Sequence, residues 1–218
     1  MTSDKSKNLI LLYRLIFGLL GWFTILATHY IQITGMDTLS IDILFTIVYT
    51  YRYFTMQTNL LVLIWWSLAI YSYRNPEILE KIMGPIKGAL TLCISITFLI
   101  YAIILAPLHQ PTGFSAFINL VTHYITPIAF IIDWIITERE KLTFQIIIYW
   151  LIYPFCYLIF AVVHGLLTEN FLYPFLALNT LGPVNFVISV SFVVLLFIGL
   201  SCLYVIGSRY KYKIYNPS

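Results

Sequence analysis

Charged residues are scarce in this sequence. Asp, Glu, Lys and Arg make up only 10% of the 218 residues, whereas soluble globular chains contain about 25%. Hydrophobic residues make up 61%, and the mean hydropathy is +0.91. The solvated exterior of a soluble domain of this size needs more polar side chains than that. The composition therefore excludes a disordered chain and a nucleic-acid partner, and it predicts a polytopic membrane protein.

Cysteine is also rare. The chain has three cysteines, Cys93, Cys156 and Cys202, and each lies inside an apolar run. We therefore expect no disulfide bonds, and the low cysteine content excludes a secreted disulfide scaffold.

What the sequence has is a series of long apolar runs. Each contains about the 20 residues that a helix needs to cross a 30 Å hydrocarbon core. They cover residues 9–31, 53–72, 88–106, 119–137, 142–164 and 184–206. We predict an all-α bundle of six transmembrane helices that forms one integral membrane domain over residues 1–218, with a short interfacial helix near 41–49.

The basic residues predict the orientation of these spans. Ten of the 12 Lys and Arg residues lie before span one, between spans two and three, between spans four and five, or after span six. Arg52 lies on the opposite side, and Arg14 lies within span one. The positive-inside rule therefore predicts that both termini are cytoplasmic.

With this topology, all four histidines fall in the outer half of the membrane, at positions 29, 109, 123 and 164. Most of them lie at the ends of spans, but His123 lies about four residues inside span four, where ionisable groups usually face the bundle interior. Pro127 lacks the amide that would bond the His123 carbonyl, so we expect a bend there. Asn119, His123 and Thr126 share one face. The alternative is a structural kink with a hydrogen-bonded histidine.

Span two begins with a second polar face at a similar depth. Arg52, Thr55 and Asn59 share this face, and Gln57 lies nearby. A hydroxyl beside an imidazole forms a nucleophile with its general base, and Arg52 or the amides of Gln57 and Asn59 could stabilise an oxyanion. Alternatively, the Thr55 hydroxyl bonds its own helix backbone, as threonines in membrane helices often do.

The positions of the acidic residues limit whether a carboxylate can complete a catalytic triad with His123. Asp133 is ten positions beyond His123, about 15 Å along a helix, so it cannot orient that imidazole. We expect Asp133 at the cytoplasmic edge with the charged residues 138–141. On the outer side, Asp37, Asp42 and Glu169 all lie in connections. The sequence therefore predicts a Thr–His dyad, or a dyad whose third member comes from a loop.

An aromatic stripe runs along span five. It consists of Tyr149, Tyr153, Tyr157 and Phe160, and it ends near His164. Such stripes usually serve helix packing, but the same residues could line a groove for an acyl chain.

Four features resemble one known family in order along the chain. They are YFT at 53–55, the Asn119, His123 and Pro127 pattern, His164 late in span five, and YPFL at 173–176 followed by LGP at 181–183. In these four features the sequence resembles the androgen-induced and androgen-dependent six-transmembrane protein family. The characterised members of that family are threonine hydrolases of fatty acid esters of hydroxy fatty acids. The resemblance implies that Thr55 is the nucleophile and His123 the catalytic histidine.

We therefore expect an intramembrane esterase without a cofactor, whose substrate is a membrane lipid or another fatty-acyl ester. Its active site would face the non-cytoplasmic side. The supporting residues would be Arg52, Gln57, Asn59, Asn119 and His164. The low-charge, Ile-rich sequence suits a bacterial member of the family, located in the plasma (inner) membrane. The oligomeric state stays open.

Two other functions stay open. The chain could be a zinc-dependent hydrolase whose metal ligands come from His29, His109, His123 and His164, although no HExxH or similar close spacing is present. It could also be a non-catalytic protein that binds or transports lipids, although we find no internal repeat of the kind that transporters often contain.

Overall fold

The computed structural model describes residues 4–35, 43–74 and 76–216, and these residues are mostly helical and contain no β-strand. The α-helices are α1 (Asp4–Thr34), α2 (Ile43–Thr50), α3 (Phe54–Tyr71), α4 (Pro76–Ile100), α5 (Gly113–Leu120), α6 (Thr126–Thr137), α7 (Ile146–Thr168) and α8 (Leu178–Tyr215). Shorter helical turns are η1 (Ser72–Arg74), η2 (Tyr101–Leu105), η3 (Val121–Ile125) and η4 (Pro174–Leu176). The predicted all-α class is confirmed, and a short helix, α2, lies where one was expected.

Six helical segments are long and apolar enough to cross a membrane. They cover Asp4–Thr34, Phe54–Arg74, Pro85–Leu105, Gly113–Thr137, Ile146–Thr168 and Leu178–Tyr215. Helices satisfy their own backbone hydrogen bonds, which the hydrocarbon core cannot do for them. The chain is thus a multi-pass integral membrane protein with six spans.

The third span begins earlier than predicted. It includes Lys87, which the sequence assigned to the connection between spans two and three. The reason is that a lysine can lie inside a span when it is paired with an acidic group, and such a pair cannot be seen in local hydropathy.

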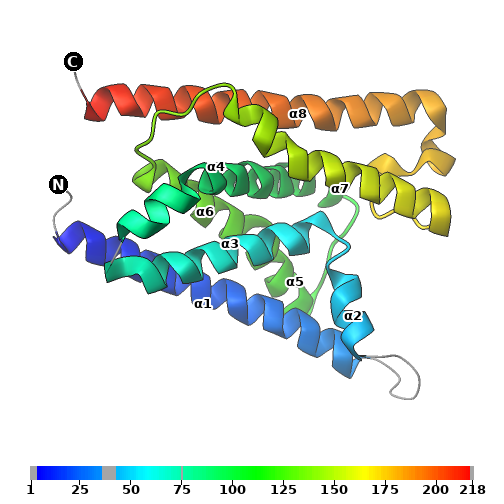
Figure 1. Cartoon of the computed structure of the whole chain (residues 1–218). Helices are drawn as coiled ribbons and strands as arrows, with labels where there is room; N and C mark the ends of the chain where they lie inside the picture. Colours follow the sequence, from blue (N-terminus) through cyan, green and yellow to red (C-terminus); the bar gives the residue numbers. More distant parts are fainter. Residues whose placement is uncertain (1–3, 36–42, 75, 217–218) are drawn as a thin grey trace. The chain divides into compact units, whose positions relative to one another are not determined.

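The chain divides into two compact units, Met1–Glu138 and Arg139–Ser218. In the first unit, α1, α3, α4 and α6 pack side by side (Figure 1). Their core consists mainly of large apolar side chains, among them the fully buried Leu63, Trp66 and Phe130. Gly21 allows α1 to approach α3 closely, because a Cβ atom there would lie 2.4 Å from Leu63 Cδ2.

Two π-helical turns interrupt the first unit. In η2, the Ala106 amide bonds the Tyr101 carbonyl at 2.8 Å, and in η3 the Thr126 amide bonds the Val121 carbonyl. Pro127 is the second residue of α6, which follows η3, and it has no amide hydrogen, so a regular α-helical ladder cannot continue through this point. The bend predicted around Pro127 therefore takes the form of a π turn.

The second unit contains α7 and α8, which pack together. Gly165 of α7 leaves room for Phe171, because a Cβ atom at this glycine would lie 2.2 Å from the ring. The YPFL segment then joins α7 to α8, and Tyr157 Oη donates a 3.2 Å hydrogen bond to Tyr173 Oη. Gly182, in the following LGP segment, has φ 71°, a conformation that glycine adopts without strain.

Candidate functional site

His123 lies in the η3 turn with its imidazole held on two sides. Its Nδ1 lies 3.2 Å from the carbonyl oxygen of Asn119, and its ring stacks on Tyr101 with centroids 3.7 Å apart. A carbonyl oxygen can only accept, so Nδ1 carries the hydrogen and donates it. In the neutral ring, Nε2 is then the nitrogen with the free lone pair. This is the tautomer that a general base requires.

Thr55 lies in the first turn of α3 and is partly buried. Within the described residues its hydroxyl has no hydrogen-bond partner. Most threonines in the spans behave differently and donate to a carbonyl one turn earlier, as do Thr24, Thr28 and Thr91. At Thr55 the corresponding carbonyl, that of Tyr51, accepts a 2.7 Å hydrogen bond from Gln57 Nε2. The bonding of Thr55 to its own helix, which was the alternative, is thus absent.

Asn59 connects the two segments that carry Thr55 and His123. Its Nδ2 donates to the Thr55 carbonyl at 2.9 Å and to the Thr122 carbonyl at 3.2 Å. The amide of Thr126 bonds Val121, and Pro127 has no amide hydrogen, so the Thr122 carbonyl lacks a helical donor. The buried Asn59 side chain supplies that donor. The carbonyl that this side chain satisfies is one residue before the one predicted, because the π turn shifts the hydrogen-bond register.

Further polar residues lie near the hydrogen bonds of Asn59. Thr58 and Thr97 are both buried, and their hydroxyl oxygens lie 2.9 Å apart across α3 and α4. Thr122 and Thr126 are also buried and flank His123 along the chain. The site is therefore a polar layer between the start of α3, the end of α4 and the η3 turn.

Arg52 and Gln57 have partners in the turn before α3, and their predicted role toward a reacting ester stays a prediction. The guanidinium of Arg52 lies 3.5 Å from the ring centroid of Tyr49 and 4.8 Å from that of Tyr53, and its Nη2 donates to Tyr53 Oη at 2.8 Å. The Gln57 amide bonds the Tyr51 backbone, as described above. Both side chains thus stabilise the turn between α2 and α3.

His164 and the aromatic stripe belong to the second unit. His164 Nδ1 lies 3.2 Å from the Asn170 carbonyl oxygen at the end of α7. Along α7, Tyr149 and Phe160 are exposed, whereas Tyr153 and Tyr157 are partly buried. Phe160 lies next to His164, with ring centroids 5.9 Å apart. Whether this stripe forms an acyl-chain groove stays a prediction.

The two histidines at the ends of spans one and three in the first unit have different surroundings. His29 Nε2 pairs with Tyr51 Oη at 3.1 Å, and His109 is exposed in the connection after η2. In the described part of the chain, no group of three His, Cys, Asp or Glu side chains could hold a metal ion. The zinc alternative stays a hypothesis. Of the acidic residues considered as a third member, Asp37 and Asp42 lie outside the described residues, and Glu169 is exposed in the second unit.

Asp133 is buried in the first unit, with 2% of its surface exposed. Its place at the cytoplasmic edge of the membrane stays a prediction, but its partners could not be read from the sequence. One carboxylate oxygen accepts from Arg14 Nε at 2.8 Å and from Trp66 Nε1 at 2.8 Å. The other accepts from Arg14 Nη2 at 2.9 Å and from Lys87 Nζ at 2.6 Å.

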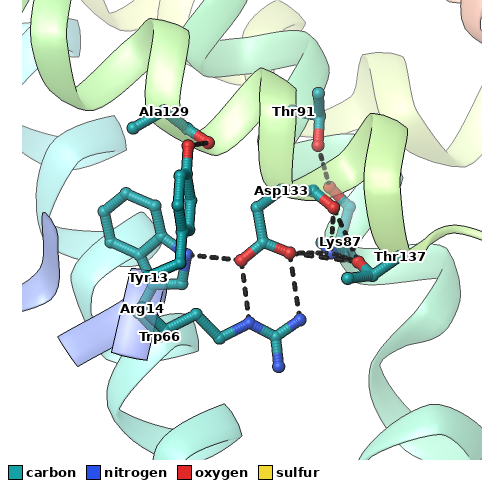
Figure 2. Close-up of polar contacts among 8 residues, drawn as sticks. All are labelled: Tyr13, Arg14, Trp66, Lys87, Thr91, Ala129, Asp133 and Thr137. Carbon is teal, nitrogen blue, oxygen red and sulfur yellow. Dashed lines mark hydrogen bonds and ion pairs between the residues drawn. The ribbon is translucent and has the colours of Figure 1, made fainter. Parts of the chain in front are cut away.

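Figure 2 shows how these groups converge on Asp133 from α1, α3 and α4. Thr137 adds a 3.0 Å hydrogen bond to the carboxylate, and Lys87 Nζ also contacts Thr137 Oγ1. Arg14 and Lys87 further lie 4.9 and 4.5 Å from the ring centroid of Trp65. With these donors the carboxylate has no lone pair left to bind a ligand. Its role is therefore structural, and it connects the four helices.

Comparisons of the chain with protein-family models, curated proteins and solved structures gave no match.

Proposed function

We propose that this chain is an intramembrane esterase that hydrolyses fatty-acyl esters, with Thr55 as nucleophile and His123 as general base. The observation that carries the proposal is the double hydrogen bond of Asn59, which joins the backbone of Thr55 to the turn that contains His123. The proposed chemistry requires the hydroxyl of Thr55 and the imidazole of His123, which lie far apart in the sequence, to meet at this junction.

The state of each group supports its role. The Asn119 carbonyl holds the hydrogen on Nδ1 of His123, which leaves Nε2 basic. In serine hydrolases a carboxylate does this orienting work, and here a backbone carbonyl takes its place. The Thr55 hydroxyl has no competing acceptor among the described residues, so its hydrogen is not committed to its own helix. A positioned base of this kind typically accelerates such reactions by about 10²–10⁴-fold.

The reaction needs only the ester and water. Thr55 Oγ1 attacks the ester carbonyl carbon while its proton moves to His123 Nε2, and the C–O bond to the alcohol then breaks. The imidazolium returns this proton to the leaving alkoxide, so an alcohol departs and an acyl-threonine remains. Water then attacks the acyl carbon, His123 accepts the proton from water, and the proton returns to Thr55 as the fatty acid leaves.

The surroundings favour a lipid substrate. The spans expose many large apolar side chains to the bilayer, so an acyl chain can approach laterally without leaving the hydrocarbon phase. The positive-inside rule orients both termini toward the cytoplasm and the start of α3 toward the opposite face, where water is near. The proposed location is the plasma (inner) membrane of a bacterium. A fatty acid ester of a hydroxy fatty acid is the substrate we expect.

The test is hydrolysis of such an ester by the purified protein in lipid nanodiscs, measured as free fatty acid released. We expect Thr55→Ala and His123→Asn each to lower kcat by more than about 10²-fold. Thr28→Ala and His109→Asn are matched controls, because the Thr28 hydroxyl bonds its own helix and His109 is exposed. Both controls should keep wild-type turnover. Undiminished hydrolysis by Thr55→Ala would reject the covalent mechanism.

A further inference from the structure

The ring of Tyr101 covers one face of the His123 imidazole. The two ring planes differ by 20° and their centroids are 3.7 Å apart, so the rings are stacked in full contact. Tyr101 itself is buried, with 4% of its surface exposed. The ring of Tyr124 packs against it edge-on at 5.7 Å, which holds the tyrosine ring in turn.

Both stacked residues lie on π turns. Tyr101 begins η2 at the end of α4, and His123 is the middle residue of η3. A π turn inserts one extra residue into a helix, which rotates the side chains that follow it relative to a regular ladder. The two irregular turns thus lie next to each other where the two rings meet. Single π turns are frequent at functional sites for this reason.

The stack and the hydrogen bond to Asn119 restrain the imidazole in different ways. The Asn119 carbonyl fixes which nitrogen carries the hydrogen, but a single hydrogen bond allows the ring to swing about its χ2 angle. The flat contact with Tyr101 removes that freedom, because tilting the imidazole would drive it into the phenol ring. Together they leave one orientation for Nε2.

We infer that Tyr101 is a positioning residue, whose aromatic ring holds the His123 imidazole in the orientation that bonds Asn119. The catalytic consequence rests on the proposed function, since a base must meet the threonine proton in a fixed direction. The ring of Tyr101 performs this role, and its hydroxyl does not. Tyr101→Phe should therefore behave as wild type, and Tyr101→Leu should not.

Two measurements test this inference. The first is ester hydrolysis, in which Tyr101→Leu should lower kcat about tenfold with little change in KM, because one aromatic contact is lost. The second is ¹⁵N NMR of histidine-labelled protein, with the His123 signals assigned by their absence in His123→Asn. Wild type and Tyr101→Phe should show only the Nδ1–H tautomer at His123, whereas Tyr101→Leu should show both tautomers in exchange.

Phe98→Leu is the control, because it removes an aromatic ring from α4 that packs on Tyr124 and not on His123. It should leave both readouts unchanged. A single Nδ1–H tautomer in Tyr101→Leu overturns the inference, and so does a tenfold loss of kcat in Tyr101→Phe. If wild type hydrolyses no ester, the proposed function fails, and the NMR comparison still decides the role of Tyr101.

Discussion

Replacing Asp133 by Asn tests the central role of this carboxylate in the first unit. The substitution keeps the shape of the side chain but removes its negative charge. Arg14 and Lys87 would then remain inside the bundle without the carboxylate that both contact at 2.6–2.9 Å. Their side chains are only 14% and 6% exposed, so water cannot replace it.

The magnitude follows from this burial. Removing one partner of a buried ion pair costs about 3–5 kcal/mol, because the charge left behind has lost both its hydration and its partner. Here one carboxylate serves two cations and also accepts from Trp66 Nε1. We therefore expect Asp133→Asn to lower the free energy of unfolding by at least about 3 kcal/mol.

The assay is unfolding in mixed micelles by titration with SDS, followed by tryptophan fluorescence. Asp4→Asn is the matched control, because Asp4 is exposed in the first turn of α1, and we expect it to change stability by less than about 0.5 kcal/mol. Replacing all three charges, as Arg14→Met, Lys87→Met and Asp133→Leu together, should recover more than half of the loss. A change below about 1 kcal/mol in Asp133→Asn would refute the reasoning.

Three further predictions follow from other contacts. Asn59→Asp replaces the nitrogen that donates to two carbonyls by an oxygen that cannot donate. The free energy of unfolding should fall by about 1–3 kcal/mol in the same titration, and ester hydrolysis should be lost. Asn59→Gln, which keeps the amide, should lose less stability. Gly21→Ala introduces a Cβ atom 2.4 Å from Leu63 and should lower the free energy of unfolding by about 1–3 kcal/mol. Gly18→Ala, whose Cβ atom would lie 3.9 Å from its nearest neighbour, should change it little. Equal effects of the two substitutions would contradict the close α1–α3 contact. Chelation with EDTA should leave hydrolysis unchanged, because the described residues offer no cluster of metal ligands, and loss of activity that zinc restores would support the zinc alternative.

The amino-acid sequence was sufficient for the six spans and for the irregularity near Pro127. Spans can be predicted because the thickness of the bilayer demands about 20 apolar residues in a row, which is a local property of the chain. The missing amide of Pro127 is likewise local. Sequence alone could not say that the irregularity would be a π turn, because that depends on a donor, Asn59, that arrives from another helix.

Asp133 shows most clearly what could not be predicted from the sequence. The sequence predicted Asp133 near residues 138–141 and Lys87 in a connection, and it gave no sign that the two would pair. Their pairing with each other and with Arg14 joins residues that are 46 and 119 positions apart. Charge becomes tolerable inside a membrane only when its partner is present, and that partner is brought there by the packing of the helices. The sequence by itself determined which segments enter the bilayer, and only the tertiary structure decided which polar groups meet within it.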